Sequence, residues 1–239
     1  CPFFMEFQEK LTDGGSLLYS WNFGLGADFI AHYAYYLASP LNWLLILCPQ
    51  GFVIEFMTLT IWLKIAFAGL FFFWYLKEHF HLIGKDRRYH TNTVFPALVF
   101  STAYAFSGFV AAYSWNIMWM DSIALAPLII LGLELLVKKN KPALYYVSLS
   151  VSILCNFYIS LIICIFLVLY FAILFFEQKK GKLKACVSFT WYSLLAGGTG
   201  GILLIPEAIV LGHAKSADTT LPETVEWYFG FVEELSRLC

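Results

Sequence analysis

Acidic side chains inside long apolar segments are the first candidates for chemistry in this sequence, because a charge there is costly unless it serves a function. Glu55 stands nine residues before Lys64, so the two could line one cavity or form a structural pair. Glu207 follows Pro206, where a loosened helix could expose a carboxylate to an outer cavity. Glu134 lies one turn before a lysine cluster, which favours an acid that extends to the membrane interface.

Two short turns combine polar side chains with aromatic rings. One contains Trp115, Asn116 and, further on, Asp121, and the other contains Asn156. An aromatic belt at a bilayer interface explains the rings, but it does not require the amides or the aspartate. Together with the N-terminal region, these turns could line one outward-facing pocket, where a carboxylate acts as general base on a hydroxyl and rings hold a sugar. The candidate catalytic residues are Asp28, Asp121 and Glu207, and the candidate substrate-binding residues are Trp21, Asn22, His32, Tyr35, Trp115, Asn116 and Asn156.

The composition predicts that membrane-spanning helices position these residues. The 239 residues are 60% hydrophobic and 13% charged, against about 25% charged in soluble domains. Aromatic residues make up 19% of the chain, and such rings gather at bilayer interfaces. A net charge of −1 leaves no basic surface for nucleic acid. The sequence therefore predicts a multi-pass membrane protein without a nucleic-acid partner.

The apolar runs and the basic residues between them predict six spans. A span needs about 20 apolar residues, yet the run 143–176 has 34 and would be about 51 Å long as one helix. Eleven of the fifteen Lys and Arg fall in three short loops, at 77–88, 138–141 and 179–184, which should all be cytoplasmic. The long run must therefore cross twice, with its turn near 155–158. The expected spans are about 52–75, 94–112, 117–137, 143–157, 159–176 and 185–211.

This orientation places both ends of the chain, 1–51 and 212–239, outside the cell. An amphipathic helix opens the first segment and ends at Gly14-Gly15, and it is expected to lie flat on the outer leaflet. Ser39-Pro40 predicts the cap and first turn of a second short helix. We expect an all-α, polytopic transmembrane helix bundle whose outer-face juxtamembrane loop carries short amphipathic helices.

Several motifs, taken together, resemble one protein family. The sequence SLLYSWNFGLG at 16–26 is followed by YAYYLASPLN at 33–42. Four shorter motifs continue in the same order: YAFSG at 104–108, WN at 115–116, NFY at 156–158 and EWYF at 226–229. In residue identity and spacing, over essentially the whole chain, these motifs resemble those of the YfhO family of bacterial membrane proteins. That family is larger and is similar to the C-type glycosyltransferases.

The resemblance implies a sugar transfer at the outer face of a bacterial cell membrane. The donor would be a polyprenyl-phosphate sugar, and the acceptor would be a cell-surface glycopolymer such as lipoteichoic acid. A divalent cation is the one cofactor that the implied reaction could use, and membrane lipid is the remaining partner. The family's principal base, an outer-loop Asp, would fall before Cys1. The chain is therefore expected to be an internal fragment, inactive alone, in which Asp28, Asp121 and Glu207 have supporting roles.

A polytopic transporter or lipid flippase is the alternative function. In that case Glu55, Lys64 and Glu207 would line a translocation path. A purely structural membrane subunit is a third interpretation. An outer-face enzyme concentrates its polar groups in loops above the bilayer, whereas a carrier places them near mid-membrane on broken helices. The placement of the polar groups therefore distinguishes the first two functions.

Overall fold

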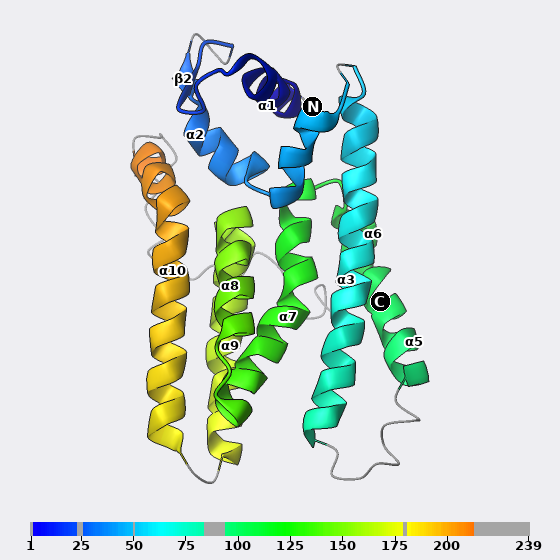
Figure 1. Cartoon of the computed structure of the whole chain (residues 1–239), viewed down its shortest axis with the longest axis vertical. Helices are drawn as coiled ribbons and strands as arrows, with labels where there is room; N and C mark the ends of the chain where they lie inside the picture. The colour runs from blue at the N-terminus through cyan, green and yellow to red at the C-terminus, as the bar shows by residue number, and fades with distance from the viewer. Residues whose placement is uncertain (1, 23–25, 50, 84–93, 179–180, 213–239) are drawn as a thin grey trace, which may run out of the picture.

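The computed structural model describes residues 2–22, 26–49, 51–83, 94–178 and 181–212. The chain is a helical bundle with an irregular N-terminal segment across one end, so the predicted all-α class is confirmed (Figure 1). The predicted C-terminal extracellular segment lies outside the described residues, Gly212 apart. The bundle helices are α3 (Val53–Ile83), α5 (Val94–Ala105), α6 (Gly108–Tyr113), α7 (Ile117–Lys139), α8 (Ala143–Cys155), α9 (Phe157–Glu177) and α10 (Lys182–Gly212).

Residues 2–22 and 26–47 form a cap over one end of the bundle, which we call the cap end (Figure 1). The only strands in the described part of the chain form an antiparallel hairpin in this cap, with Tyr19 opposite Asp28. The cap elements are α1 (Pro2–Asp13), β1 (Tyr19–Ser20), β2 (Ala27–Asp28), α2 (Phe29–His32), the π-helical turn η1 (Tyr33–Leu37) and the 3-10 helix η2 (Pro40–Leu47).

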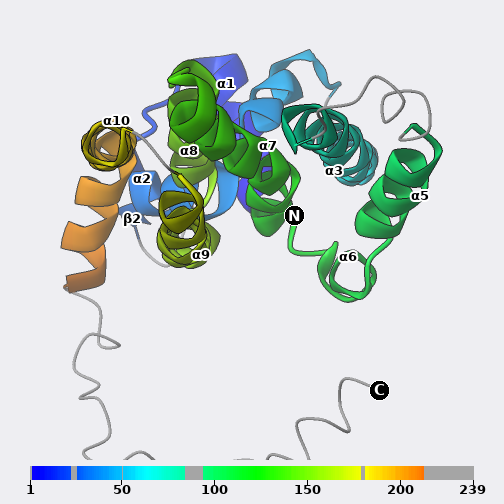
Figure 2. The same cartoon turned by 90° about the horizontal axis from the view of Figure 1, so that it is seen from below.

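Helix α7 is the centre of the bundle. Along its most apolar window 72% of residues are buried, against 17% to 28% in the other long helices. It packs against α3 on one side and against α8 and α9 on the other, while α10 packs on α8 and α5 packs on α3. Viewed from below, the helices form a row that runs from α10 through α8 and α7 to α3 and α5 (Figure 2).

Five helices within the described residues are long and apolar enough to cross a membrane. They are Val53–Leu82, Val94–Tyr113, Ile117–Lys139, Phe157–Glu177 and Lys182–Val210. Helix α8 has 13 residues, which is shorter than the roughly 20 that a span requires. A sixth crossing by α8 therefore stays a prediction.

Local sequence explains where the central helices end. Asn140 adopts a left-handed conformation (φ 55°) at the end of α7, and this conformation is a common helix stop. Asn156 separates α8 from α9, because its side-chain oxygen accepts a hydrogen bond from the backbone N–H of Ile159 at 3.0 Å. The break falls inside the turn predicted at 155–158.

A glycine sets the close approach of α7 and α8. A Cβ atom built on Gly132 would lie 2.5 Å from the backbone nitrogen of Tyr145, so a larger residue would force the two helices apart. Small residues at helix contacts are typical of membrane bundles, because apolar surface gains little by leaving lipid. The contact brings α8 against α7 although α8 is short.

The amphipathic helix α1 packs on protein, which corrects the expectation that its apolar face enters the outer leaflet. Phe4 and Phe7 are buried in a cluster with Phe29, Leu45 and Val53. The helix does end before Gly14-Gly15. The irregular segment after α1 folds back beneath the helix, so the apolar face of α1 packs on it. Helical periodicity alone does not indicate this partner.

Candidate functional site

A buried ion pair lies under the cap, between α3 and α7. The Lys64 Nζ atom is 2.7 Å from Asp121 Oδ2, and it also donates a hydrogen bond to the backbone carbonyl of Ile117 at 2.9 Å. Lys64 is only 1% exposed. The predicted relation between Lys64 and Glu55 is wrong, because Glu55 is exposed on α3 and Lys64 faces α7.

Asp121 joins the same pair to the cap. Its second oxygen, Oδ1, accepts a hydrogen bond from the Ser39 hydroxyl at 2.9 Å. Ser39 does begin η2, as predicted, but its side chain makes no cap hydrogen bond because the hydroxyl donates to Asp121. Both carboxylate oxygens are therefore engaged, and the arrangement holds the cap on the bundle.

A pocket of about 270 Å³ lies between the cap and α10. His32, Tyr35 and Tyr36 line it from α2 and η1, and Glu207 lines it from α10. Glu207 is 5% exposed, and no hydrogen bond or ion pair to it from a described residue is found. Burial raises the pKa of the Tyr35 hydroxyl, and the nearby Tyr36 and Glu207 raise it further. Tyr35 is therefore a protonated hydrogen-bond donor beside a carboxylate.

A second pocket, of about 220 Å³, lies between α1, α3 and the start of α7. Trp115 and Asn116 line it, together with Met57 of α3. Tyr36 lines both pockets, so one ring separates two small cavities at the cap end. The single pocket predicted from the sequence is divided in two, and each part contains some of the predicted residues.

The other predicted residues lie outside both pockets. Asp28 is exposed at the end of β2, and Trp21 is 78% exposed. Asn22 donates a hydrogen bond to Glu6 at 2.5 Å, which holds the hairpin on α1. Asn156 is fully buried at the start of α9. These four residues have local structural contacts or exposed positions and do not converge on one cavity.

Comparison with known protein families shows which family the chain belongs to. Residues 1–238 match the family described as "Bacterial membrane protein YfhO". The chain belongs to the YfhO family. No match was found among curated proteins or among solved structures. As a YfhO member it is a membrane protein with several apolar helices.

This YfhO chain has another buried carboxylate, on α7 at the end of the bundle opposite the cap. Glu134 of α7 is 0% exposed, so the expectation that it extends to the membrane interface is wrong. Its carboxylate lies 2.7 Å from His79 Nδ1 of α3 and accepts a hydrogen bond from the Tyr170 hydroxyl of α9 at 2.6 Å. The cluster links three spanning helices, and sequence reasoning did not bring these residues together.

Sequence reasoning also missed Tyr36, and nothing in its local pattern separates it from the neighbouring tyrosines.

No group of three or more His, Cys, Asp or Glu side chains within the described residues could hold a metal ion. Neither cap-end pocket of this YfhO chain contains more than one carboxylate. The chemistry available there is hydrogen bonding by one carboxylate, one imidazole, one amide and several aromatic side chains.

Proposed function

We propose that this YfhO protein takes part in transferring a sugar from a polyprenyl-phosphate carrier to a cell-surface glycopolymer, with the cap end on the outer face of the membrane. The observation that carries the proposal is the pocket of Glu207, Tyr35 and Tyr36. A buried carboxylate with no hydrogen-bond or ion-pair partner among the described residues, next to aromatic rings, suits a ligand with hydroxyl groups. Membership of the YfhO family and the five apolar helices support a lipid-linked substrate.

The transfer forms a bond between an acceptor oxygen and the anomeric carbon of the sugar. The bond from that carbon to the carrier phosphate breaks, and the phosphate keeps the electron pair. The acceptor hydroxyl gives up its proton to a base. In the proposed arrangement Glu207 accepts a hydrogen bond from that hydroxyl and orients it, and the Tyr35 hydroxyl donates to a ligand oxygen.

Two pockets separated by one ring suit a reaction with two substrates. The pocket at Glu207 would hold the acceptor, and the pocket at Trp115 and Asn116 would hold the donor head group. Tyr36, which lines both, would contact each substrate. A typical lost electrostatic contact at such a site reduces the rate by about 10²- to 10³-fold.

The test compares Glu207→Gln with Asp28→Asn and Glu55→Gln in cells at matched protein levels. Glu207→Gln keeps the size of the side chain and removes the carboxylate, so glycosylation of the cell-surface polymer should fall by about 10²-fold or more. Asp28 and Glu55 are exposed, and their variants should keep glycosylation near the wild-type level. Unchanged glycosylation in Glu207→Gln would contradict the proposed role of the pocket.

The carrier function is the second candidate, and the cluster around Glu134 favours it. Ionisable groups inside a membrane span mark substrate or proton pathways in many carriers. Lys64 does not favour it, because its ammonium is paired with Asp121 and donates to the backbone carbonyl of Ile117. Loss of substrate export in His79→Phe, together with no glycosyl transfer by the purified wild-type protein, would select the carrier.

A further inference from the structure

Glu207 differs from the other buried carboxylates in the described part of the chain. Four acidic side chains are buried there: Glu6, Asp121, Glu134 and Glu207. The first two are each paired with a lysine, and the third is bound by His79 and Tyr170. Glu207 has no hydrogen bond or ion pair to a described residue. A buried charge without a partner is costly, so this carboxylate needs a partner that the described residues do not supply.

No lysine that the structure describes at the cap end is available to Glu207. The Lys10 Nζ atom lies 3.5 Å from Glu6 and donates to two backbone carbonyls of the cap. The Lys64 Nζ atom is paired with Asp121 at 2.7 Å. The other described lysines belong to the opposite end of the bundle (Figure 1): Lys77, Lys138, Lys139, Lys141, Lys182 and Lys184. A ligand is therefore the remaining source of a positive charge for this pocket.

Two tyrosine rings form a corner of the pocket where α10 packs on the cap. Tyr35 and Tyr36 line the pocket from η1, with ring centroids 4.7 Å apart and 69° between the ring planes. Phe3 stacks on Tyr36 at 4.9 Å, and Phe157 contacts Tyr35 at 6.2 Å, so residues of α1 and α9 hold the two rings in place. Aromatic rings attract a cation electrostatically, and this attraction is the basis of the aromatic cages that bind ammonium ligands.

An ammonium group matches this pocket better than a metal ion or a neutral hydroxyl does. Among the described residues, the pocket offers a metal ion one carboxylate and one imidazole, whereas Ca²⁺ and Mg²⁺ take about six or more oxygen ligands. A hydroxyl can donate to Glu207 but leaves its charge uncompensated. A primary ammonium group donates hydrogen bonds to the carboxylate, balances its charge and is attracted by the rings.

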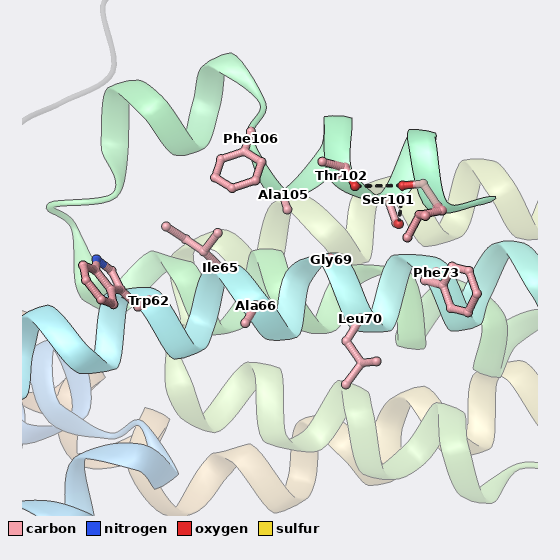
Figure 3. Close-up of a pocket in the computed structure, with 11 residues that line it drawn as sticks. Trp62, Ile65, Ala66, Gly69, Leu70, Phe73, Ser101, Thr102, Ala105 and Phe106 are labelled. Atoms are coloured by element: carbon pink, nitrogen blue, oxygen red, sulfur yellow. Dashed lines mark hydrogen bonds between the residues drawn. The ribbon is translucent and has the colours of Figure 1, made fainter. Parts of the chain in front are cut away.

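The larger groove between α3 and α5 lacks these features (Figure 3). Ser101 and Thr102 line it, but both hydroxyls donate to the backbone carbonyl of Leu98 at 2.9 Å (Figure 3). The other side chains that line it are apolar. A charged ligand group therefore has a partner in the pocket at Glu207 and none in this groove.

We propose that the acceptor carries a primary ammonium group, which binds between Glu207 and the rings of Tyr35 and Tyr36. This inference names the substrate class of the pocket and rests on the proposed function. One carboxylate oxygen would accept a hydrogen bond from the acceptor hydroxyl and the other from the ammonium group, as an amino sugar with a free amine would allow. The ethanolamine head group of a phospholipid has the same ammonium chemistry, and the experiments below separate these two sources.

Binding is tested with ethanolamine and ethylene glycol, two probes that differ in having an ammonium or a hydroxyl group at one end. Saturation-transfer NMR measures their binding to the full-length protein in phosphatidylglycerol nanodiscs. Ethanolamine should bind at least tenfold more tightly than ethylene glycol. Glu207→Gln should weaken ethanolamine binding by at least tenfold, and Glu55→Gln, which removes an exposed carboxylate of α3, should not change it. Equal binding of the two probes, or unchanged ethanolamine binding in Glu207→Gln, would overturn the proposal.

A matched pair of tyrosine variants tests the contribution of the rings. Tyr36 and Tyr113 are both exposed in part, at 37% and 44%, but only Tyr36 lines the pocket at Glu207. Tyr36→Leu should weaken ethanolamine binding by about two- to thirtyfold, the range expected for one cation–π contact. Tyr113→Leu should leave the binding unchanged. Equal ethanolamine binding in both variants would contradict an ammonium group held against the rings.

A transfer assay identifies the source of the ammonium group. In phosphatidylglycerol nanodiscs, an acceptor with free amines should be glycosylated with a kcat/KM at least tenfold higher than the same acceptor after N-acetylation. Adding phosphatidylethanolamine to the nanodiscs should leave ethanolamine binding unchanged. Equal transfer to both acceptors, with ethanolamine displaced by phosphatidylethanolamine, would assign the pocket to a lipid head group and overturn the acceptor assignment.

Binding and transfer are separated by this design, because ethanolamine binding needs no donor and no turnover. If ethanolamine does not bind while Glu207→Gln still abolishes glycosylation, the proposed function stands and the ammonium assignment is wrong. If ethanolamine binds through Glu207 but the wild-type protein transfers no sugar to either acceptor, the pocket binds an ammonium group and the proposed function is wrong.

Discussion

Two buried carboxylates on α7 have different kinds of partner. Asp121, near the cap end, pairs with Lys64 at 2.7 Å and accepts a hydrogen bond from Ser39. Glu134, about 20 Å further along the helix axis, is bound by His79 and by Tyr170. Asp121 is thus held by a lysine ammonium group, whereas Glu134 is held by an imidazole and a phenol hydroxyl, which can both donate a hydrogen bond without a charge.

The difference separates two structural roles. The Asp121 pair joins α3, α7 and the cap, so it fixes the residues that line both cap-end pockets. The Glu134 cluster joins α3, α7 and α9 and has no contact with the cap. A lysine left without its carboxylate, or the reverse, is an uncompensated charge, but a carboxylate that loses one neutral donor keeps the other. The variants below test this contrast.

The largest loss of stability is expected for Lys64→Met. The substitution keeps an apolar stem of similar length and leaves Asp121 buried without its cation, which should lower the free energy of unfolding by about 3–5 kcal/mol. Unfolding in mild detergent, followed by tryptophan fluorescence, measures the change. The double variant Lys64→Met with Asp121→Leu should regain most of the loss, because no charge is left unpaired. Unaltered stability in the single variant would show that the pair does not hold the cap.

A smaller loss is expected for His79→Phe at the other end. The variant removes one charge-assisted hydrogen bond to Glu134 but leaves the bond from Tyr170, so the free energy of unfolding should fall by about 1.5–3 kcal/mol. The same unfolding measurement applies, with His79→Gln as the control that can still donate. A loss as large as that of Lys64→Met would remove the contrast between the two carboxylates.

Neutral hydroxyl groups beside Ser122, the residue that follows Asp121 on α7, should contribute less than either carboxylate. Ser160 lies 2.7 Å from Ser152, oxygen to oxygen, and both are buried. Ser160→Ala should lower the free energy of unfolding by about 1 kcal/mol, because only neutral hydrogen bonds, to Ser152 and more weakly to Ser122, are lost. Thermal unfolding beside Ser114→Ala, a partly exposed serine after α6, gives the comparison. A loss above that of His79→Phe would show that charge is not the deciding factor.

The smallest effect is a dependence of cap stability on pH through Glu6. Burial raises the pKa of Glu6, but hydrogen bonds from Ser20 and Asn22 and the charge of Lys10 lower it more, to below the ordinary value of 4.5. The folded cap therefore gains stability from ionised Glu6 above pH 4.5, and the gain is lost as the pH falls through the lowered pKa. Limited proteolysis of the cap between pH 7 and pH 3 should show this loss, and Glu6→Gln should not. Equal curves for both proteins would contradict the assignment.

Helix ends could be predicted from the sequence because they depend on neighbouring residues. Asn156 and Gly14-Gly15 mark ends that the structure also has. The partner of Lys64 could not be predicted in the same way. Nine residues separate it from Glu55, a spacing that places two side chains on opposite faces of a helix, and its true partner is 57 positions away. That pairing depends on how α3 and α7 are rotated about their axes.

The Glu134 cluster carried a signal that could have been used. Glu134, His79 and Tyr170 all stand within about two turns of helix ends that face the predicted cytoplasmic loops, so the three lie at similar depth. For the other pocket, sequence reasoning named Glu207, His32 and Tyr35 but did not group them with Tyr36, because Tyr35 and Tyr36 reach the pocket only through the fold of the cap. The conformation of an irregular segment such as η1 is set by tertiary packing, and such a segment has no hydrophobic periodicity from which its structure could be predicted.

The central claim is that the pocket at Glu207 takes part in sugar transfer, whereas the buried charges of α7 serve the structure. The most direct measurement is transfer of a radiolabelled sugar from a polyprenyl-phosphate donor by the purified full-length protein in nanodiscs. We expect turnover by the wild type, a fall of about 10²- to 10³-fold in Glu207→Gln and near-normal turnover in Ser160→Ala. Wild-type protein that transfers no sugar, or a Glu207→Gln variant that transfers it at the wild-type rate, would contradict the account.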